Sequence, residues 1–272
     1  MPERDPAAAP RSSPTDVEVA VLAARAAADV LLDLRRRAGG DADLRARGDR
    51  DAQAAIARVL ADLRPGDAVL SEEAADVSDR LSAERVWIID PLDGTREYGE
   101  AGRDDWAVHV ALWERGTGDL TRAAVALPAR GLVLTTDTPT GGARVPAPHG
   151  GPPRFAVSRT RATRVVTDVA AGMGGELVPM GSAGVKVSAV VLGQVDAYVH
   201  TGGQYEWDSA APVAVARAAG LHTSRVDGSP LLYNQADVKL PDLVVCRPEL
   251  ASDILTLLAE LLTAATSDGG PS

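Results

Sequence analysis

The stretch WIIDPLDGT, at residues 87–95, is the part of this sequence that most strongly constrains its fold. Residues 85–89 are almost continuously apolar, which predicts a buried strand that ends at Asp90. A second carboxylate, Asp93, follows in the same segment, and the glycine and threonine after it suit the first turn of a helix. Because functional side chains are often found where a regular element gives way to a loop, this segment is a candidate site.

Two kinds of chemistry could use this segment. The carboxylates of Asp90 and Asp93 can bind a hard cation such as Mg²⁺ at about 2.0 to 2.1 Å, and free N–H groups at a helix start attract phosphate. Pro91 stiffens the intervening backbone, so the carbonyl of Leu92 can point to the same metal. An Asx turn followed by a helix N-cap accounts for the same residues without a ligand, and the segment alone leaves both interpretations open.

Three further acidic clusters lie elsewhere in the chain, and they contain Asp49, Glu72 and Asp208. Taken singly, the first could cap a helix and the second could be a surface carboxylate after a strand. The third could be the N-cap of a helix over residues 209–219. The occurrence of all four clusters in one chain favours a shared site that binds a cation.

The composition limits the possible functions. The 272 residues are 45% hydrophobic and 24% charged, enough to form a core in one large domain or two closely packed ones. The net charge of −10 disfavours binding to nucleic acid or to an anionic membrane. A single cysteine, Cys246, and the absence of a predicted signal peptide or membrane span favour a cytoplasmic protein. The histidines lack metal-binding spacing, so His109 is expected to be structural.

Local patterns predict the first elements. A capping box at Thr15 and Glu18 begins a first helix that ends at residues 39–40, and a second helix is expected over residues 51–63. A short strand is expected at residues 68–73. Alternating or apolar runs then predict an antiparallel sheet with strands near residues 106–113, 121–128 and 131–136.

A Pro/Gly-rich stretch at residues 137–153 marks a domain boundary or a surface excursion. Beyond it, strands and helices alternate. The strands are expected at residues 155–158, 176–180, 196–200 and 242–246, and the helices near 161–172, 183–192, 209–219 and 248–265. The organisation predicted is α/β, with an N-terminal α+β part over residues 14–150, a smaller C-terminal α/β part over 151–266, and disordered ends at 1–13 and 267–272.

Three motifs in order carry a family resemblance: SEE at residues 71–73, WIIDPLDGT, and WDSAAPVAVARAAG at residues 207–220. The chain resembles the lithium-sensitive, magnesium-dependent phosphomonoesterases, which include inositol monophosphatase, fructose-1,6-bisphosphatase and 3′-phosphoadenosine 5′-phosphate (PAP) phosphatase. Residues 96–98, Arg-Glu-Tyr, together with residues 181–198, resemble the PAP phosphatase branch of the bacterial CysQ type. Inositol phosphatases typically have Thr-Asn-Phe after the DGT.

The resemblance implies an α-β-α-β-α layered sandwich and assigns roles to residues of this chain. It implies that the metal ligands are Glu72, Asp90, the Leu92 carbonyl, Asp93, Asp208 and, for a third ion, Asp49. Residues 45–53, RARGDRDAQ, depart from the family pattern, so Asp51 could replace Asp49. The resemblance also implies a catalytic group of Thr95, Asp49 and Glu72.

The substrate contacts are expected to involve backbone and side chains around the metals. The resemblance and the residue types together predict contacts from Leu92, Asp93, Gly94, Thr95, Arg96, Ser182, Lys186 and Asp208. Among these, Arg96 and Lys186 are candidates for an anion contact remote from the metals, and Lys186 lies one helical turn after Ser182. A solvent-exposed lysine on a helix is the ordinary alternative.

The resemblance implies two or three Mg²⁺ ions, inhibition by Li⁺, a homodimer, and a small phosphorylated substrate. The branch predicts hydrolysis of PAP to AMP and phosphate, with inositol 1-phosphate and fructose 1,6-bisphosphate as alternatives. A phosphatase that forms an aspartyl-phosphate is disfavoured, because Leu92 occupies the position where that motif needs its nucleophile. A nucleotide-binding regulator of the same fold is the non-enzymatic alternative.

Overall fold

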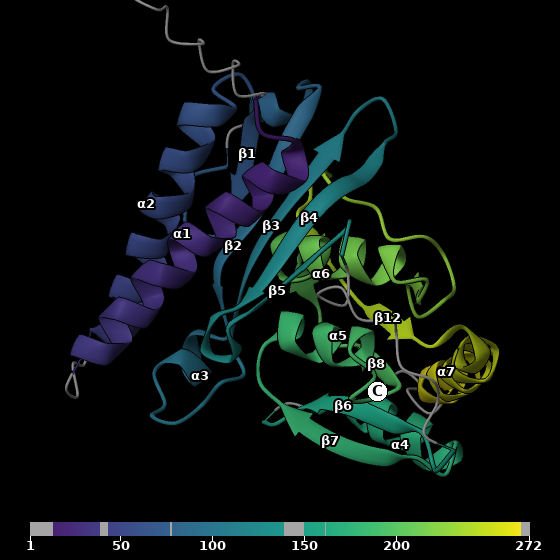
Figure 1. The fold of residues 1–272 in the computed structure, drawn as a ribbon. Helices are drawn as coiled ribbons and strands as arrows, with labels where there is room; N and C mark the ends of the chain where they lie inside the picture. The colour runs from purple at the N-terminus through teal and green to yellow at the C-terminus, as the bar shows by residue number, and fades with distance from the viewer. Residues whose placement is uncertain (1–12, 39–42, 77, 139–149, 161, 268–272) are drawn as a thin grey trace, which may run out of the picture.

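A computed structural model of the chain describes residues 13–38, 43–76, 78–138, 150–160 and 162–267. In these residues, two five-stranded sheets alternate with three layers of helices (Figure 1). The helices are α1 (Asp16–Arg37), α2 (Leu44–Leu63), α3 (Thr95–Tyr98), α4 (Arg164–Gly172), α5 (Ala183–Val191), α6 (Glu206–Ala218) and α7 (Ala251–Ser267). The predicted α/β class and the layered α-β-α-β-α sandwich are confirmed.

The first sheet has the order β1-β2-β3-β4-β5. Its strands are β1 (Ala68–Ser71), β2 (Arg85–Asp93), β3 (Ala107–Glu114), β4 (Asp119–Leu127) and β5 (Leu132–Thr135). β1 runs parallel to β2 and the other pairs are antiparallel, as the alternating sequence pattern predicts for β3 to β5. The pairing of β2 with β3 is irregular between Asp90 and Asp93, which bends the candidate segment out of the regular ladder.

The second sheet has the order β10-β12-β8-β6-β7. Its strands are β6 (Arg154–Ser158), β7 (Glu176–Met180), β8 (Ala197–His200), β10 (His222–Ser224) and β12 (Leu243–Cys246). A separate two-residue strand, β9 (Gln204–Tyr205), pairs with β11 (Lys239–Leu240) immediately before α6. Strands of this sheet alternate with α4, α5 and α6 along the chain, as expected for an α/β arrangement.

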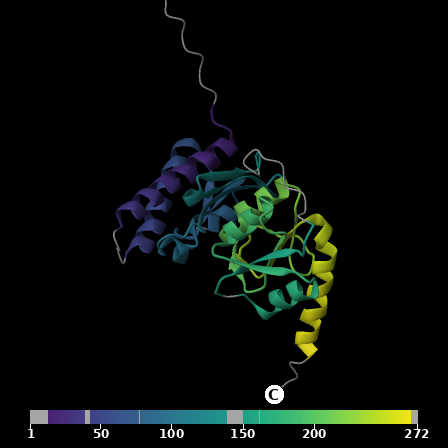
Figure 2. The same ribbon diagram turned by 60° about the horizontal axis from the view of Figure 1, so that its bottom comes forward.

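Three hydrophobic clusters join the five layers. The first packs α1 and α2 on one face of the first sheet, the second packs α5 and α6 between the two sheets, and the third packs α4 and α7 on the outer face of the second sheet. Figure 2 shows the α1 and α2 pair and α7 on opposite sides of the molecule. The helices α5 and α6 are therefore the shared middle layer, and their N-terminal ends approach β2.

The first helix begins as its sequence predicts. The Thr15 side chain accepts a hydrogen bond from the Glu18 N–H at 3.3 Å, and the Glu18 carboxylate accepts one from the Thr15 N–H at 2.7 Å. The buried positions of α1 are largely alanine, which allows the helix to lie close to α2 and to the sheet. The predicted end at residues 39–40 lies outside the described residues.

Three predicted boundaries are wrong. Helix α2 begins at Leu44, because the arginines and alanine before residue 51 are good helix formers, so Asp49 lies inside the helix and does not cap it. Strand β2 continues to Asp93 and does not end at Asp90. Helix α6 begins at Glu206, so Asp208 lies in its first turn and is not the N-cap.

The division of the chain near residue 150 stays a prediction, because residues 139–149 lie outside the described part. The same holds for the predicted disorder of residues 1–12 and 268–272. Ser267, the first residue of the predicted C-terminal segment 267–272, is the last residue of α7. No helix in the described residues is long and apolar enough to cross a membrane.

Asp16 joins the start of α1 to the rest of the first layer. Its carboxylate accepts hydrogen bonds from Arg64 and Arg85, each at 2.8 Å. Arg85 also binds Asp67 and Glu114, so one guanidinium holds α1, β2 and β3 together. Partial burial alone would raise the pKa of Asp16, but the two arginines outweigh it and the pKa lies below its ordinary value.

The low pKa of Asp16 predicts a pH-dependent contribution to stability. Because the folded protein binds the Asp16 proton less readily than the unfolded chain, this contribution is present above the ordinary pKa of 3.8 and is lost as the pH falls further. Asp16→Asn is therefore expected to lower the free energy of unfolding by about 1 to 2 kcal/mol at pH 7, and by less near pH 3.

Urea unfolding at the two pH values measures this difference. Asp33→Asn is the matched control in the same helix, because Asp33 pairs only with exposed arginines and should have little effect. A destabilisation by Asp16→Asn that is equal at both pH values would contradict the prediction.

Candidate active site

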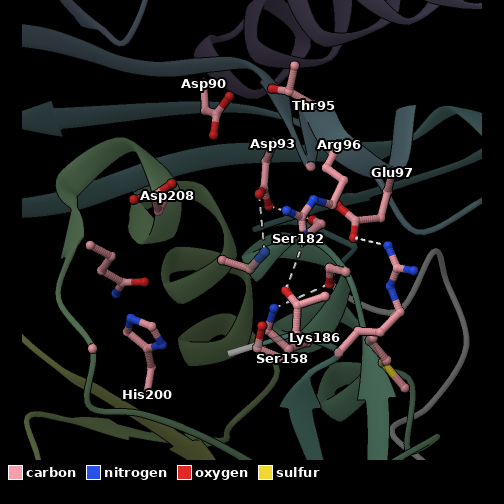
Figure 3. A pocket seen from close by; sticks show the side chains of 18 of the residues that line it. Asp90, Asp93, Thr95, Arg96, Glu97, Ser158, Ser182, Lys186, His200 and Asp208 are labelled. Atoms are coloured by element: carbon pink, nitrogen blue, oxygen red, sulfur yellow. Dashed lines mark hydrogen bonds and ion pairs between the residues drawn. The ribbon is translucent and has the colours of Figure 1, made fainter. Parts of the chain in front are cut away.

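Three of the four acidic clusters line one pocket with a volume of about 730 Å³, and the cluster that contains Asp49 does not line it. One wall of the pocket is formed by the end of β2 and by α3, which follows it. The other wall is formed by the start of α5, the end of β8 and the start of α6 (Figure 3). Figure 3 shows the side chains of Asp90, Asp93 and Asp208 on one side of this pocket, with Lys186 and Ser158 across from them. The sequence-predicted residues that line it are Glu72, Asp90, Leu92, Asp93, Gly94, Thr95, Arg96, Ser182, Lys186 and Asp208.

The backbone of the DPLDGT segment is held in an unusual path. The Asp90 carboxylate accepts a hydrogen bond from the Leu92 N–H at 2.9 Å, so the Asx interaction that the sequence allows is present beside the cluster of carboxylates. Gly94 has a φ of 89°, and an added Cβ would lie 3.1 Å from the Cβ of Ser182 and 3.2 Å from the Asp105 carbonyl. A glycine is therefore required at this point, both for conformation and for space.

Asp93 connects the two sheets. Its carboxylate accepts hydrogen bonds from the Ser182 hydroxyl, from the Ala183 N–H at 3.1 Å and from the Gly184 N–H at 2.6 Å. These donors form the start of α5, whose unpaired N–H groups favour a negative charge. Burial alone would raise the pKa of Asp93, but the contact with His109 and the donors from α5 lower it to about 2.

The other carboxylates have no comparable donors and repel one another. Burial and the neighbouring Asp93 raise the pKa of Asp90 well above its ordinary range. Burial, then Asp208 and the other acids, raise the pKa of Glu72 to about 7. Burial and Asp93 raise the pKa of Asp208 to about 6, although its side chain accepts a hydrogen bond from the Tyr205 N–H at 2.6 Å.

This set of groups fits a hard divalent cation. Carboxylate oxygens come together from β2, from the turn after β1 and from α6. The raised pKa values of Glu72, Asp90 and Asp208 arise first from burial and then from the negative charges placed together. Asp90, Asp93 and His109 each offer a ligand atom within 4.8 Å of the others. A bound cation would offset the repulsion that the protein groups leave uncompensated, so the acidic cluster is a candidate metal centre.

Thr95 lies between the cluster and α2. Its hydroxyl is 3.3 Å from the Asp49 carboxylate and 3.1 Å from the Leu92 carbonyl, and it can donate to either. Burial, then the charge of Glu73, raise the pKa of Asp49 to about 6. Asp51, the alternative to Asp49, instead pairs with Arg50 at 3.3 Å on the exposed side of α2.

The basic side of the pocket is formed by Lys186 and Arg96. Lys186 is 5% exposed, donates to the Gly181 carbonyl at 3.3 Å, and lies 5.2 Å from the centre of the Tyr198 ring. Burial lowers its pKa, against the attraction of the nearby acids. Arg96 is exposed at the edge of the pocket and donates to the Thr160 hydroxyl at 3.2 Å. The alternative of a solvent-exposed surface lysine is therefore wrong for Lys186.

Several pocket residues were not found from the sequence. Arg159 pairs with Glu97 at 3.0 Å across the pocket wall, and Tyr205 is 42% exposed at the rim, where it stacks on Trp207 at 4.8 Å. His109 contacts the cluster from β3, directly opposite Asp90 in the strand register. Counting the register from the strand pattern could have placed His109 beside Asp90. No sequence pattern marks Arg159 or Tyr205, whereas Glu97 lies in the Arg-Glu-Tyr segment that carries the family resemblance.

The fold and the site define a known class of protein. Residues 14–263 match the Inositol monophosphatase family, and the chain belongs to this family. The family resemblance predicted from the three motifs is therefore confirmed. The matched range includes every helix and strand named for this structure, apart from the last residues of α7, and it includes the carboxylates of the site.

Close relatives are named in more detail. The chain is 54% identical over 240 residues to a protein of Mycobacterium bovis named 3′-phosphoadenosine 5′-phosphate phosphatase, covering 86% of this chain and 90% of the relative. A protein of Mycobacterium leprae with the same name is 52% identical over 260 residues, covering 91% and 94%. Both relatives carry the name PAP phosphatase, which is the branch that residues 96–98 and 181–198 predict.

A solved structure supports the fold. CysQ from Bacteroides thetaiotaomicron, described as a bacterial member of the inositol monophosphatase family, superposes with a TM-score of 0.73. It is 24% identical, and the alignment covers 85% of this chain and 97% of that one. At this identity the similarity concerns the architecture alone.

The raised pKa of Asp208 predicts the effect of removing its charge. The folded protein holds this proton to a higher pH than the unfolded chain, so the ionised carboxylate destabilises the metal-free fold above about pH 6. Asp208→Asn keeps an oxygen for the Tyr205 N–H. Because the penalty builds up between the ordinary pKa of 3.8 and about 6, it is expected to raise the Tm by a few degrees at pH 8 in EDTA, by less at pH 5, and to gain little below pH 3.8.

Calorimetry in EDTA and in Mg²⁺ measures both effects. Wild type should gain stability from Mg²⁺ and Asp208→Asn should gain much less. Asp168→Asn, on the outer helix α4, is the control and should respond to Mg²⁺ as wild type does. A lower Tm for Asp208→Asn in EDTA at pH 8 would contradict the account of charge repulsion.

Proposed function

We propose that this protein is a magnesium-dependent phosphomonoesterase that hydrolyses PAP to AMP and phosphate. The observation that carries the proposal is the convergence of Glu72, Asp90, Asp93 and Asp208, from three separate segments, on one pocket that also has a buried ammonium group. The relatives at 54% and 52% identity, which bear the name of this activity, support the choice of substrate.

The proposed metal ligands are Glu72, Asp90, the Leu92 carbonyl, Asp93 and Asp208. When bound, Mg²⁺ neutralises phosphoryl oxygens and makes a water molecule more acidic. The protein contributes the fixed positions of the oxygen donors. Asp93 is the most rigidly held of them, because three hydrogen bonds from the start of α5 fix its carboxylate. Asp49 is proposed as a ligand of a third ion.

Thr95 and Asp49 are proposed to orient the attacking water and accept its proton. The Thr95 hydroxyl receives a hydrogen bond from the water while donating its own hydrogen to the Asp49 carboxylate, 3.3 Å away. A carboxylate with a pKa raised to about 6 is a better base near neutral pH than an ordinary aspartate. Glu72 is proposed to assist from the opposite side of the cluster.

The substrate would be held by groups on both sides of the pocket. The N–H groups of Gly94 and Thr95 and the first turn of α6 face the phosphate that is removed. Lys186 and Arg96 are proposed to bind the second phosphate, because a nucleotide bisphosphate requires a cation away from the metal ligands. The Ser182 hydroxyl holds Asp93, so its proposed contribution to substrate binding is indirect.

We also propose three properties that follow from the family resemblance: a homodimer, a cytoplasmic location, and inhibition by Li⁺. The geometry of the site bears on none of the three. Equilibrium sedimentation and inhibition by LiCl at constant ionic strength test the first and the last.

The choice of substrate predicts an order of specificity. The value of kcat/KM is expected to be largest for PAP and smaller for inositol 1-phosphate and fructose 1,6-bisphosphate, because this ratio measures differential binding of the transition states. Phosphate release from the three substrates at the same Mg²⁺ concentration measures the order. If inositol 1-phosphate or fructose 1,6-bisphosphate has the largest value, the PAP assignment is wrong while the phosphatase assignment stands.

The proposed roles predict different defects in two variants. Asp93→Asn removes the charge of a metal ligand and should abolish turnover and weaken Mg²⁺ binding, with an unchanged circular dichroism spectrum. Thr95→Ala should keep Mg²⁺ affinity and lose about 10² to 10⁴ in kcat, the usual contribution of a positioned proton acceptor. Steady-state kinetics and calorimetric titration with Mg²⁺ measure the two. Equal losses of Mg²⁺ affinity in both variants would contradict this separation of roles.

A further inference from the structure

His109 is buried at the contact between the two parts of the candidate metal centre. It lies on β3, has no exposed surface, and does not line the pocket. Its neighbours on the same face of the strand, Ala107 and Ala111, are small, so the imidazole extends beyond them toward α6. A buried imidazole needs partners for its ring nitrogens, because an unpaired polar group in the interior is costly.

The two ring nitrogens contact two different elements. Nε2 lies 3.3 Å from Oδ2 of Asp93, the ligand on β2, but does not make a hydrogen bond to it. Nδ1 lies 3.1 Å from the carbonyl oxygen of Trp207, and a carbonyl can only accept, so Nδ1 donates to it. Trp207 is the residue before Asp208 in the first turn of α6. One side chain therefore spans from one proposed metal ligand to the backbone that carries another.

The start of α5 closes around the same ring. A Cβ added to Gly184 would lie 2.0 Å from Nε2 of His109 and 3.1 Å from Oδ2 of Asp93, so only glycine fits between them. The Gly184 N–H itself donates to the same Oδ2 at 2.6 Å. His109 and the start of α5 thus enclose one oxygen of Asp93 from two directions, and the other oxygen, Oδ1, accepts a longer hydrogen bond from the Ala183 N–H at 3.1 Å.

We propose that His109 is a positioning residue that fixes Asp93 and Asp208 relative to each other across the metal centre. This inference rests on the proposed function, since it assumes that both carboxylates bind Mg²⁺. Helix α6 and strand β2 belong to different segments of the chain, and a shift of α6 along the sheet would change the separation of the two ligands. The imidazole opposes that shift with a hydrogen bond to the Trp207 carbonyl at one end and, at the other, by tight packing between Asp93 and Gly184.

The role predicts a loss of metal affinity that a simple packing defect would not cause. Groups that hold metal ligands in place typically contribute about 10- to 100-fold in affinity. His109→Ala should therefore raise the Kd for Mg²⁺ by a factor in this range, measured by calorimetric titration of the full chain without substrate. His109→Asn, which keeps a donor and an acceptor on a shorter side chain, should recover part of the loss.

Val110→Ala is the matched control. Val110 is the next residue of β3, is equally buried, and faces α1 and α2 on the other side of the sheet. The Val110→Ala substitution should lower the Tm and leave the Kd for Mg²⁺ unchanged. At saturating Mg²⁺, both His109 variants should regain most of their kcat with PAP, because the ligands themselves are intact.

Two results would overturn the proposal in distinguishable ways. If wild type binds Mg²⁺ and His109→Asn and His109→Ala bind it with the same Kd while losing Tm as Val110→Ala does, His109 is only a core residue. If His109→Ala does not fold, the Kd of His109→Asn is compared with that of wild type, and an unchanged Kd again means that His109 is only a core residue. If wild type itself binds no Mg²⁺, the proposed function fails and this inference fails with it.

Discussion

The hydrogen bonds between Asp93 and the start of α5 are the contact on which the rest of the site depends. They join the end of β2, in the first sheet, to the helix that begins the middle layer against the second sheet. Asp105 adds a parallel contact, since its carboxylate accepts from the Gly181 N–H at 2.6 Å. With the hydrogen bonds to Asp93 and Asp105 in place, the pocket has fixed walls on both sides, and the remaining acidic side chains are brought to it from the turn after β1 and from α6.

The same arrangement explains why the site needs a cation. Asp93 has enough donors to stay ionised when buried, but burial and the charge of Asp93 together raise the pKa of Asp90 and of Asp208. The protein thus satisfies one carboxylate fully and leaves its neighbours in mutual repulsion, an arrangement that is unfavourable without a counter-ion. If these carboxylates served only in structural ion pairs, arginines would be expected beside them, as they are found beside Asp16 and Asp67.

Much of this could be predicted from the sequence where the signal is local. The capping box at Thr15, the apolar run of β2 and the carboxylates of DPLDGT depend on neighbouring residues, and the structure contains each of them. The starts of α2 and α6 were misplaced, because acidic residues that resembled caps lie inside those helices. The role of His109 could not be found by spacing, since its partners Asp93 and Trp207 are distant in sequence and meet only through the sheet register and the packing of α6.

We expect the acidic side chains of β2 and α6 to form one metal centre. A crystal structure of the protein with Mn²⁺, analysed at a wavelength that gives anomalous signal from manganese, tests it most directly. An anomalous peak is expected within coordination distance of Asp90, Asp93 and Asp208 together. A peak elsewhere on the surface, or an empty site between these carboxylates at saturating Mn²⁺, would contradict it.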